Sequence, residues 1–168
     1  MLSSLHKAAV AASIVVLASS AAYAAARVGQ KAAAFSLVTF DKRKVKLADL
    51  RGQVVVINHW ATWCGPCKSE MPMMSAFHRR YKDRGFVIFG VTTEDSVAGG
   101  KLKAVAAALS YRLVSRFSGN AYPILGGLPT TYVIDRKGIV RAAKSGAFDE
   151  REFRTLILPL LDEPVPAP

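Results

Sequence analysis

The feature that most constrains the fold is a run of aliphatic residues that leads directly into a pair of cysteines. Val54 to Ile57 form the run, and Cys64 and Cys67 follow it as the only two cysteines among 168 residues. Four consecutive aliphatic residues are typical of a strand that is buried on both faces, as in a parallel sheet. Over residues 65–84 apolar side chains recur at steps of three and four, which predicts a helix. The cysteine pair therefore lies at a strand-to-helix junction.

A Cys-x-x-Cys pair at such a junction is typical of thiol–disulfide exchange. Cys64 caps the predicted helix, so free backbone N–H groups and the positive end of the helix dipole stabilise its thiolate. We therefore expect Cys64 to be the nucleophile and Cys67 to be the resolving thiol. A purely structural disulfide is the weaker alternative, because a bridge across two residues closes a small loop and removes little chain entropy.

The first 24 residues have the organisation of an export signal. Lys7 precedes an uncharged, apolar stretch from Ala8 to Ala22, and residues 22–24 have the small-x-small form of a cleavage site. An uncleaved membrane anchor that reaches residue 26 is the alternative. The expected organisation is a signal peptide at 1–24, one folded domain at 30–163 and a disordered tail at 164–168.

The chain is strongly basic, with a formal net charge of +11. Removal of the leader, which holds one cation and no acid, leaves +10. The cations are scattered along the chain and form no block interleaved with aromatic residues, so we expect a solvated basic surface and no nucleic-acid partner. The sequence shows no internal repeat and no second domain, and we expect a monomer.

The remaining patterns predict an α/β domain with a central mixed sheet flanked by helices. A small N-terminal hairpin is expected from residues 35–47. Further strands are expected at 53–60, 86–92, 113–117, 130–134 and 139–143, and helices at 65–84 and 96–109. A last helix begins after Asp149 as its N-cap, and Pro159 is expected to end it early.

Four segments carry a resemblance to thioredoxin-fold oxidoreductases of the TlpA/ResA kind. They are residues 47–52, 54–58, 60–67 and 127–135, within a likeness that spans residues 30–163. The resemblance implies a thioredoxin-like fold with an N-terminal β-hairpin extension, and a protein-disulfide reductase without a cofactor. It also implies a periplasmic location, protein clients with disulfides and a membrane-bound electron donor. Such proteins serve, for example, in cytochrome c maturation or in copper delivery to cytochrome oxidase.

The resemblance also assigns roles around the cysteine pair. It implies that Pro129 is a cis-proline beside the disulfide and that the backbone of Leu128 pairs with an extended client segment. Trp63, Gly65 and Pro66 are expected to contribute to the client surface, and Gly-Pro between the cysteines is the dipeptide of reducing thioredoxins. The assignment as a reductant rests on this dipeptide.

Two positions depart from related proteins. Asn58 stands where cytosolic thioredoxins keep a buried carboxylate, so a buried acid must come from elsewhere or be absent. Glu70 matches an acidic position near the disulfide in related proteins, although a solvated helix carboxylate is an equal alternative; Glu94 is a weaker second candidate. His59 stands where the family often has Phe, and we expect it on a solvent-facing side of the sheet rather than as a metal ligand or a group that tunes the thiolate.

Other classes of site fit the residues less well. A structural zinc site needs about four ligands, and the mature chain offers two cysteines with His59 and His78 at unsuitable spacing. Lys68 stands where a haem attachment motif needs His, and Ala61 where a peroxidatic cysteine needs Thr. We therefore expect no metal. The main rival is a periplasmic chaperone that holds Cu(I) between the two thiolates, although Met71 and Met74 are more simply explained as core; the second rival is a disulfide-forming oxidase.

Overall fold

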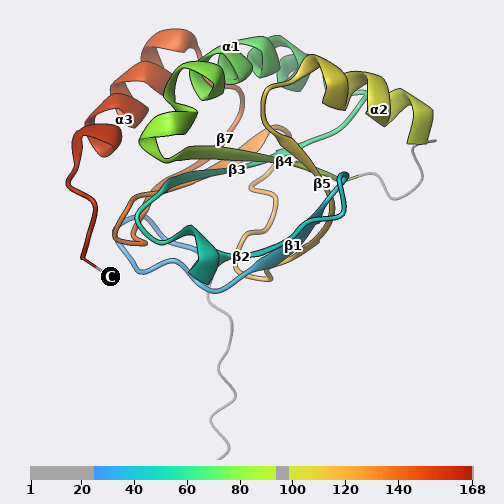
Figure 1. Ribbon diagram of the computed structural model, residues 1–168. Helices are drawn as coiled ribbons and strands as arrows, with labels where there is room; N and C mark the ends of the chain where they lie inside the picture. The colour runs from blue at the N-terminus through green and yellow to red at the C-terminus, as the bar shows by residue number, and fades with distance from the viewer. Residues whose placement is uncertain (1–24, 94–98, 168) are drawn as a thin grey trace, which may run out of the picture.

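The computed structural model describes residues 25–93 and 99–167, which form one seven-stranded sheet and three α-helices (Figure 1). The helices are α1 (Gly65–Tyr81), α2 (Gly99–Ala108) and α3 (Glu150–Asp162), with short 3-10 helices η1 (Leu47–Leu50) and η2 (Lys82–Arg84). The strands are β1 (Ser36–Thr39), β2 (Lys44–Lys46), β3 (Val54–Trp60), β4 (Phe86–Thr92), β5 (Arg112–Ser118), β6 (Thr130–Ile134) and β7 (Val140–Ser145). Their order across the sheet is β2-β1-β5-β4-β3-β6-β7.

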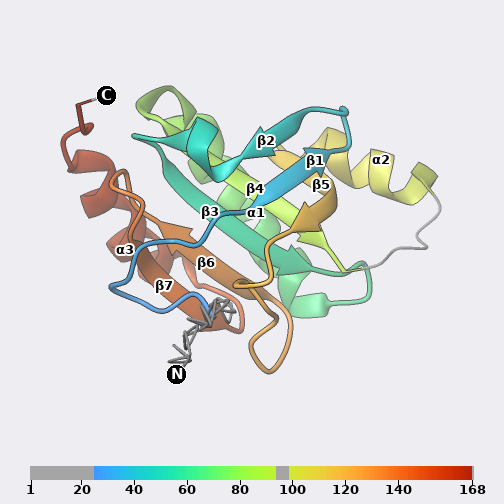
Figure 2. The same ribbon diagram turned by 90° about the horizontal axis from the view of Figure 1, so that it is seen from below.

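The sheet is mixed, as the sequence predicts. β3, β4 and β5 are parallel neighbours, whereas β1, β2, β6 and β7 join the sheet in antiparallel pairs. α1 connects β3 to β4, and α2 connects β4 to β5, so the chain steps twice in the same direction across the sheet. Because such crossovers are almost always right-handed, both helices lie on the same face. Figures 1 and 2 show α3 on that face as well.

β3 is the central strand and is buried at all seven of its positions. Successive side chains of a strand point to opposite faces, and β3 therefore supplies two cores. Val54, Val56 and Trp60 enter the helix-side core, which is the cluster between the sheet and the three helices. Val55 and Ile57 enter the hairpin-side core on the other face, with Phe35, Leu37, Phe89, Tyr122 and Tyr132.

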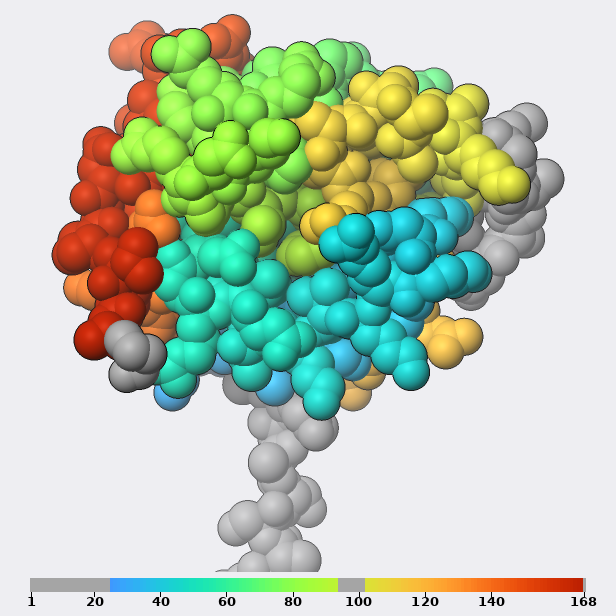
Figure 3. Space-filling view, viewed as in Figure 1, coloured from blue at the N-terminus to red at the C-terminus, as the bar shows by residue number. Residues whose placement is uncertain are grey.

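The predicted N-terminal hairpin is confirmed and extends the sheet. β1 pairs with β2 and, on its other side, with β5 in antiparallel register, with an irregularity between Val38 and Thr39. In the space-filling view the hairpin residues (cyan) lie directly below the α2 residues (yellow) (Figure 3). The residues before β1 are tied to the far edge by backbone hydrogen bonds from Gly29 to Val140 and from Ala32 to Gly138. Together these segments cover the face opposite the helices.

The last helix begins as predicted but ends later. The Asp149 side chain accepts a hydrogen bond from the Glu152 backbone N–H at 2.7 Å and forms a capping box with it. α3 then continues through Pro159 to Asp162, so the expected early end is wrong. A proline removes one helix hydrogen bond, here the one to the Thr155 carbonyl. Thr155 and Pro159 are both exposed, so water can solvate that carbonyl.

Some predictions fall outside the described residues. The export signal at 1–24 and the candidate acid Glu94 lie there, and α2 is described only from Gly99. Residues 164–167 follow α3 without a helix or strand. No helix within the described ranges combines the length and the apolar character that crossing a membrane requires.

Candidate active site

The cysteine pair lies where β3 ends and α1 begins, as the sequence predicts. Cys64 is the N-cap of α1, and its Sγ accepts a hydrogen bond from the Cys67 backbone N–H at 3.2 Å. The two cysteines form a disulfide with their Cα atoms 5.3 Å apart. Pro66 lies in the first turn, where a missing N–H costs no helix hydrogen bond. After reduction, this N–H and the helix dipole stabilise negative charge on the Cys64 sulfur.

The two sulfurs differ in access to solvent. Cys64 is 3% exposed and Cys67 is 0% exposed, so Cys64 is the residue that a client approaches first. Trp63, directly before Cys64, is 70% exposed, which is unusual for a tryptophan. Gly65 and Pro66 are exposed as well. The residues assigned to the client surface therefore form an exposed rim around a recessed disulfide.

Pro129 and Leu128 come from a different part of the chain. The Leu128–Pro129 peptide bond is cis, as the resemblance implies. Pro129 is buried directly before β6, and β6 pairs with β3 so that Thr130 is the partner of His59. Leu128 is half-buried and packs against the helix-side core, which contains both cysteines. The loop that contains Leu128 and Pro129, called the proline loop below, therefore lies at the same sheet edge as the disulfide.

Glu70 is a buried carboxylate, and the alternative of a solvated helix residue is wrong. It is 3% exposed and lies on α1 three residues after Cys67, a spacing that puts both residues on one face of the helix. Its Oε1 accepts a hydrogen bond from Asn58 Nδ2 at 2.8 Å, and its Oε2 accepts one from the Phe148 backbone N–H at 2.9 Å. Glu70 therefore brings the buried acid to Asn58, the position that holds the carboxylate in cytosolic thioredoxins.

Burial and the hydrogen-bond partners of Glu70 shift its pKa in opposite directions. Burial raises the pKa of Glu70 above its ordinary value, because a charge is poorly solvated in the protein interior. The two hydrogen bonds from Phe148 and Asn58, and the positive charge of Lys144, pull the pKa of Glu70 down without cancelling the effect of burial. A carboxyl with a raised pKa holds a proton more readily than an ordinary carboxyl, which suits it to take up a proton and return it.

The partners of Glu70 include residues that sequence reasoning missed. Phe148 and Lys144 lie around the loop between β7 and α3, and the Lys144 ammonium sits 4.4 Å from the centre of the Phe148 ring. Thr131 on β6 accepts a second hydrogen bond from Asn58 Nδ2 at 3.0 Å. No local sequence signal identifies these residues, because Phe148 is 78 positions from Glu70 and Thr131 is 73 positions from Asn58.

His59 is buried, so the expectation of a solvent-facing side chain is wrong. It is 6% exposed and enters the hairpin-side face, where its ring meets Phe117 and Tyr132 edge to face, with ring centres 5.7 and 6.3 Å away. Burial lowers the pKa of His59 to about 4, although a hydrogen bond to the Tyr122 backbone opposes this effect. The loop and hairpin that cover this face come from distant parts of the chain, which is why the local pattern fails.

The buried His59 is expected to make the oxidised protein less stable in acid. An unfolded histidine takes up a proton near pH 6.5, whereas folded His59 does so only near pH 4. The unfolded state therefore binds more protons between these values, and stability falls as the pH drops through this window. The expected contribution is a loss of about 3 kcal/mol between pH 7 and pH 4.

Urea unfolding of the oxidised protein at both pH values measures this loss. His59→Phe, which keeps an aromatic ring in the same core, removes the titrating group. The unaltered protein is expected to lose about 3 kcal/mol more than the variant between pH 7 and pH 4. Equal losses in the two proteins would show that His59 does not carry the effect.

The described residues do not assemble a metal site from three or more His, Cys, Asp or Glu side chains. His59 points to the face of β3 opposite Asn58 and Trp60, away from the helix-side core that holds the cysteines. Met71 and Met74 are buried in the helix-side core, which confirms their interpretation as core residues.

The fold and the site together define the class of the protein. A redox-capable cysteine pair caps the helix after the central strand of a thioredoxin-like sheet, and a cis-proline loop lies at the same edge. These are the features of a thioredoxin-fold thiol–disulfide oxidoreductase. The chain belongs to the AhpC/TSA family, whose family model matches residues 28–143.

Individual relatives agree with this class and confirm the resemblance to ResA-type proteins. The thioredoxin-like protein YneN of Bacillus subtilis is 33% identical over 128 residues, which cover 74% of this chain and 75% of YneN. The thiol-disulfide oxidoreductase ResA of Geobacillus kaustophilus is 33% identical over 132 residues, which cover 77% of this chain and 75% of the relative. A crystal structure of a thiol:disulfide interchange protein from Chlorobium tepidum matches 82% of this chain and 99% of its own, with 29% identity and a TM-score of 0.67.

Proposed function

We propose that this thiol–disulfide oxidoreductase is an exported, monomeric reductant of protein disulfides. The observation that carries the proposal is the combination of a helix-capping Cys64 with a buried acid, Glu70, one turn behind Cys67. The N-terminus of α1 stabilises Cys64 as an attacking thiolate, and Glu70 can accept the proton of the resolving thiol. Both are needed for rapid transfer of two electrons to a client disulfide.

The reaction proceeds in two exchange steps. The Cys64 thiolate attacks one sulfur of the client disulfide, forms a mixed disulfide and releases the other client sulfur as a thiolate. Cys67 then attacks Cys64 Sγ, which releases the second client thiolate and closes the Cys64–Cys67 disulfide. The pair loses two electrons and the client gains them. The closed disulfide is the oxidised product of this cycle.

Glu70 serves the second step. Cys67 is fully buried, and burial in apolar surroundings disfavours a thiolate. Its thiol must nevertheless lose a proton before it attacks. The Glu70 carboxylate is buried on the same helix face and is held in place by Asn58 and Phe148. It acts as the base that receives this proton, and its raised pKa allows the proton to be returned to solvent or to the leaving thiolate.

The client binds as an extended segment along the proline loop. No hydrogen bond joins the Leu128 backbone to other residues in the described part of the chain, so its N–H and C=O can pair with a client strand. Thr130 Oγ1 accepts a hydrogen bond from the Leu125 N–H and donates one to the Gly127 C=O, which holds the loop in shape. Trp63, the residue directly before Cys64, offers an exposed aromatic surface.

The proposal also includes the direction of electron transfer and the cellular location of the protein. The Gly65-Pro66 dipeptide favours reduction, and the leader at 1–24 favours export to the periplasm, where a membrane-bound donor would reduce the pair again. The resemblance to TlpA/ResA-type proteins suggests clients in cytochrome c or cytochrome oxidase maturation. The reduction potential of the cysteine pair tests the direction, because a strong reductant and a strong oxidant of this fold differ by roughly 150 mV.

A further inference from the structure

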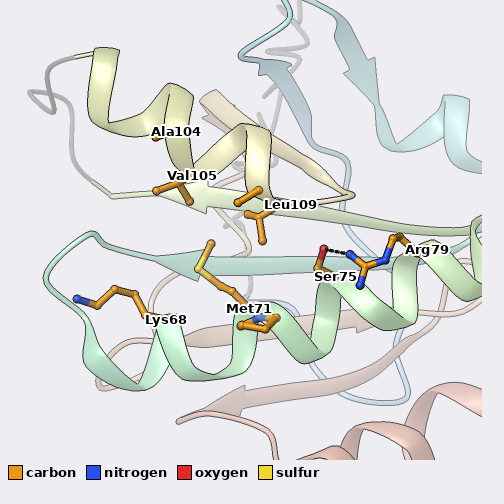
Figure 4. Close-up of a pocket in the computed structure, with 9 residues that line it drawn as sticks. Lys68, Met71, Ser75, Arg79, Ala104, Val105 and Leu109 are labelled. Atoms are coloured by element: carbon orange, nitrogen blue, oxygen red, sulfur yellow. Dashed lines mark hydrogen bonds between the residues drawn. The ribbon is translucent and has the colours of Figure 1, made fainter.

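A groove of about 590 Å³ runs between α1 and α2 on the helix-covered face (Figure 4). Its apolar lining includes Met71 from α1 and, from α2 and the residue after it, Val105 and Leu109. Ala104 and Ala108 line the α2 wall and are exposed. Because alanine side chains are short, the two helices leave the space between them unfilled.

The two ends of the groove carry positive charge. Lys68 and Arg79 lie at opposite ends of its α1 wall, as Figure 4 shows. They are 11 positions apart in one helix, which corresponds to roughly 16 Å along its axis. Arg79 Nη1 donates a hydrogen bond to Ser75 Oγ at 3.2 Å, which holds the guanidinium along the groove. Neither cation forms an ion pair with any residue in the described ranges.

Among the described residues that line the groove, no acid offsets these charges. The lining, as far as residues 25–93 and 99–167 supply it, contains no Asp or Glu. Glu70 is the one acid in α1, and it is buried toward Asn58 and Phe148, while the sequence of α2 contains none. The described part of the groove therefore combines an apolar floor with a cation at each end, which favours an occupant that is both apolar and acidic.

We propose that this groove is a docking site for a client segment that places apolar side chains between acidic ones, an inference that rests on the proposed reductase function. The groove begins at Lys68, the residue after Cys67, so a client disulfide at Cys64 can have its neighbouring segment in the groove. Roughly five residues of extended chain span its 16 Å length. The groove thereby selects clients by the residues beside their disulfide.

Two synthetic peptides of equal length test the proposal. Each carries one cysteine activated as a mixed disulfide with 2-nitro-5-thiobenzoate. The acidic probe has leucines between glutamates, and the neutral probe has glutamine in place of each glutamate. Cys64 of the reduced protein attacks the mixed disulfide, and nitrothiobenzoate leaves as a coloured thiolate. Cys67 then releases the peptide thiol and closes the protein disulfide. The second-order rate of colour release is measured for each probe.

Arg79→Glu and Ala104→Trp are the informative variants. The acidic probe is expected to react roughly three- to tenfold faster than the neutral probe with the unaltered protein, and Arg79→Glu is expected to remove this advantage. Ala104→Trp fills the groove and is expected to slow both leucine-containing probes. Arg80→Glu is the matched control, since Arg80 is the next residue, is exposed and does not line the groove. Circular dichroism and thermal melting confirm that each variant is folded.

2,2′-Dipyridyl disulfide, a small uncharged disulfide without a peptide, separates docking from chemistry. All variants are expected to reduce it at the unaltered rate, because Arg79, Arg80 and Ala104 lie outside the disulfide site. If Arg79→Glu and Arg80→Glu lower the rate with the acidic probe equally, the effect is one of general charge, and the proposal that the groove is a docking site is overturned. Equal rates for the two probes with the unaltered protein would also overturn it. Failure of the unaltered protein to reduce the small disulfide would contradict the proposed function itself.

Discussion

Cys67→Ser is expected to arrest the protein as a mixed disulfide with its client, whereas Cys64→Ser is expected to reduce turnover to the uncatalysed rate. Cys64 caps α1 and is the more accessible sulfur, while Cys67 is fully buried behind it. Without Cys67 the first exchange still takes place, but no thiol remains to release the client. Each Cys67→Ser molecule therefore releases a single client thiol and then stops.

Non-reducing gels and mass spectrometry of trapped complexes measure this difference, together with the rate of insulin reduction. The double variant Cys64→Ser/Cys67→Ser is the control and should capture nothing. If Cys64→Ser accumulates the complexes and Cys67→Ser does not, then Cys67 is the attacking sulfur and the assignment of the two roles is reversed.

Glu70→Gln is expected to slow the attack of Cys67 on the mixed disulfide by roughly 10²-fold near neutral pH, the lower range for loss of a general base. Gln keeps the shape and a hydrogen-bond acceptor but cannot take a proton. In the unaltered protein the rate of this step rises with pH as Glu70 loses its proton. The midpoint of that rise lies above 4.5, because burial raises the pKa of Glu70. The variant is expected to lack this rise and to gain speed only where the Cys67 thiol itself ionises.

The lifetime of a preformed mixed disulfide, followed by rapid mixing over a range of pH, measures this step alone. Glu150→Gln is the matched control, because Glu150 is an exposed residue of the first turn of α3. A merely structural role for Glu70 predicts lower stability with an unchanged pH profile. If the rate of Cys67 attack in Glu70→Gln still rises over the pH range in which Glu70 loses its proton in the unaltered protein, Glu70 is not the base.

Local sequence signals predict much of this fold. The aliphatic run before Cys64 defines β3, and the apolar steps that follow define α1 to within a turn. Asp149 is identified as an N-cap because a side-chain acceptor three residues before Glu152 satisfies free N–H groups within one short segment. Each of these patterns involves residues only a few positions apart, so the element that it predicts can be identified without the tertiary structure.

The parts that could not be predicted depend on contacts between distant segments. Helical spacing puts Glu70 on the face of Cys67, but only the fold brings Asn58 and the Phe148 N–H to its carboxylate. The burial of His59 could not be predicted either, because it depends on β5 and the loop after β5. α3 passes Pro159 because a lost helix bond costs little where the freed carbonyl faces solvent.

The reduction potential of the Cys64–Cys67 pair tests the central claim most directly. The protein is equilibrated with dithiothreitol or glutathione buffers of known potential, and the fraction of reduced pair is counted by thiol alkylation and mass spectrometry. The proposed reductant is expected to have a potential near the roughly −270 mV of thioredoxin or below it. A potential near the roughly −120 mV of a strong disulfide oxidant would contradict the account and make this a disulfide-forming enzyme.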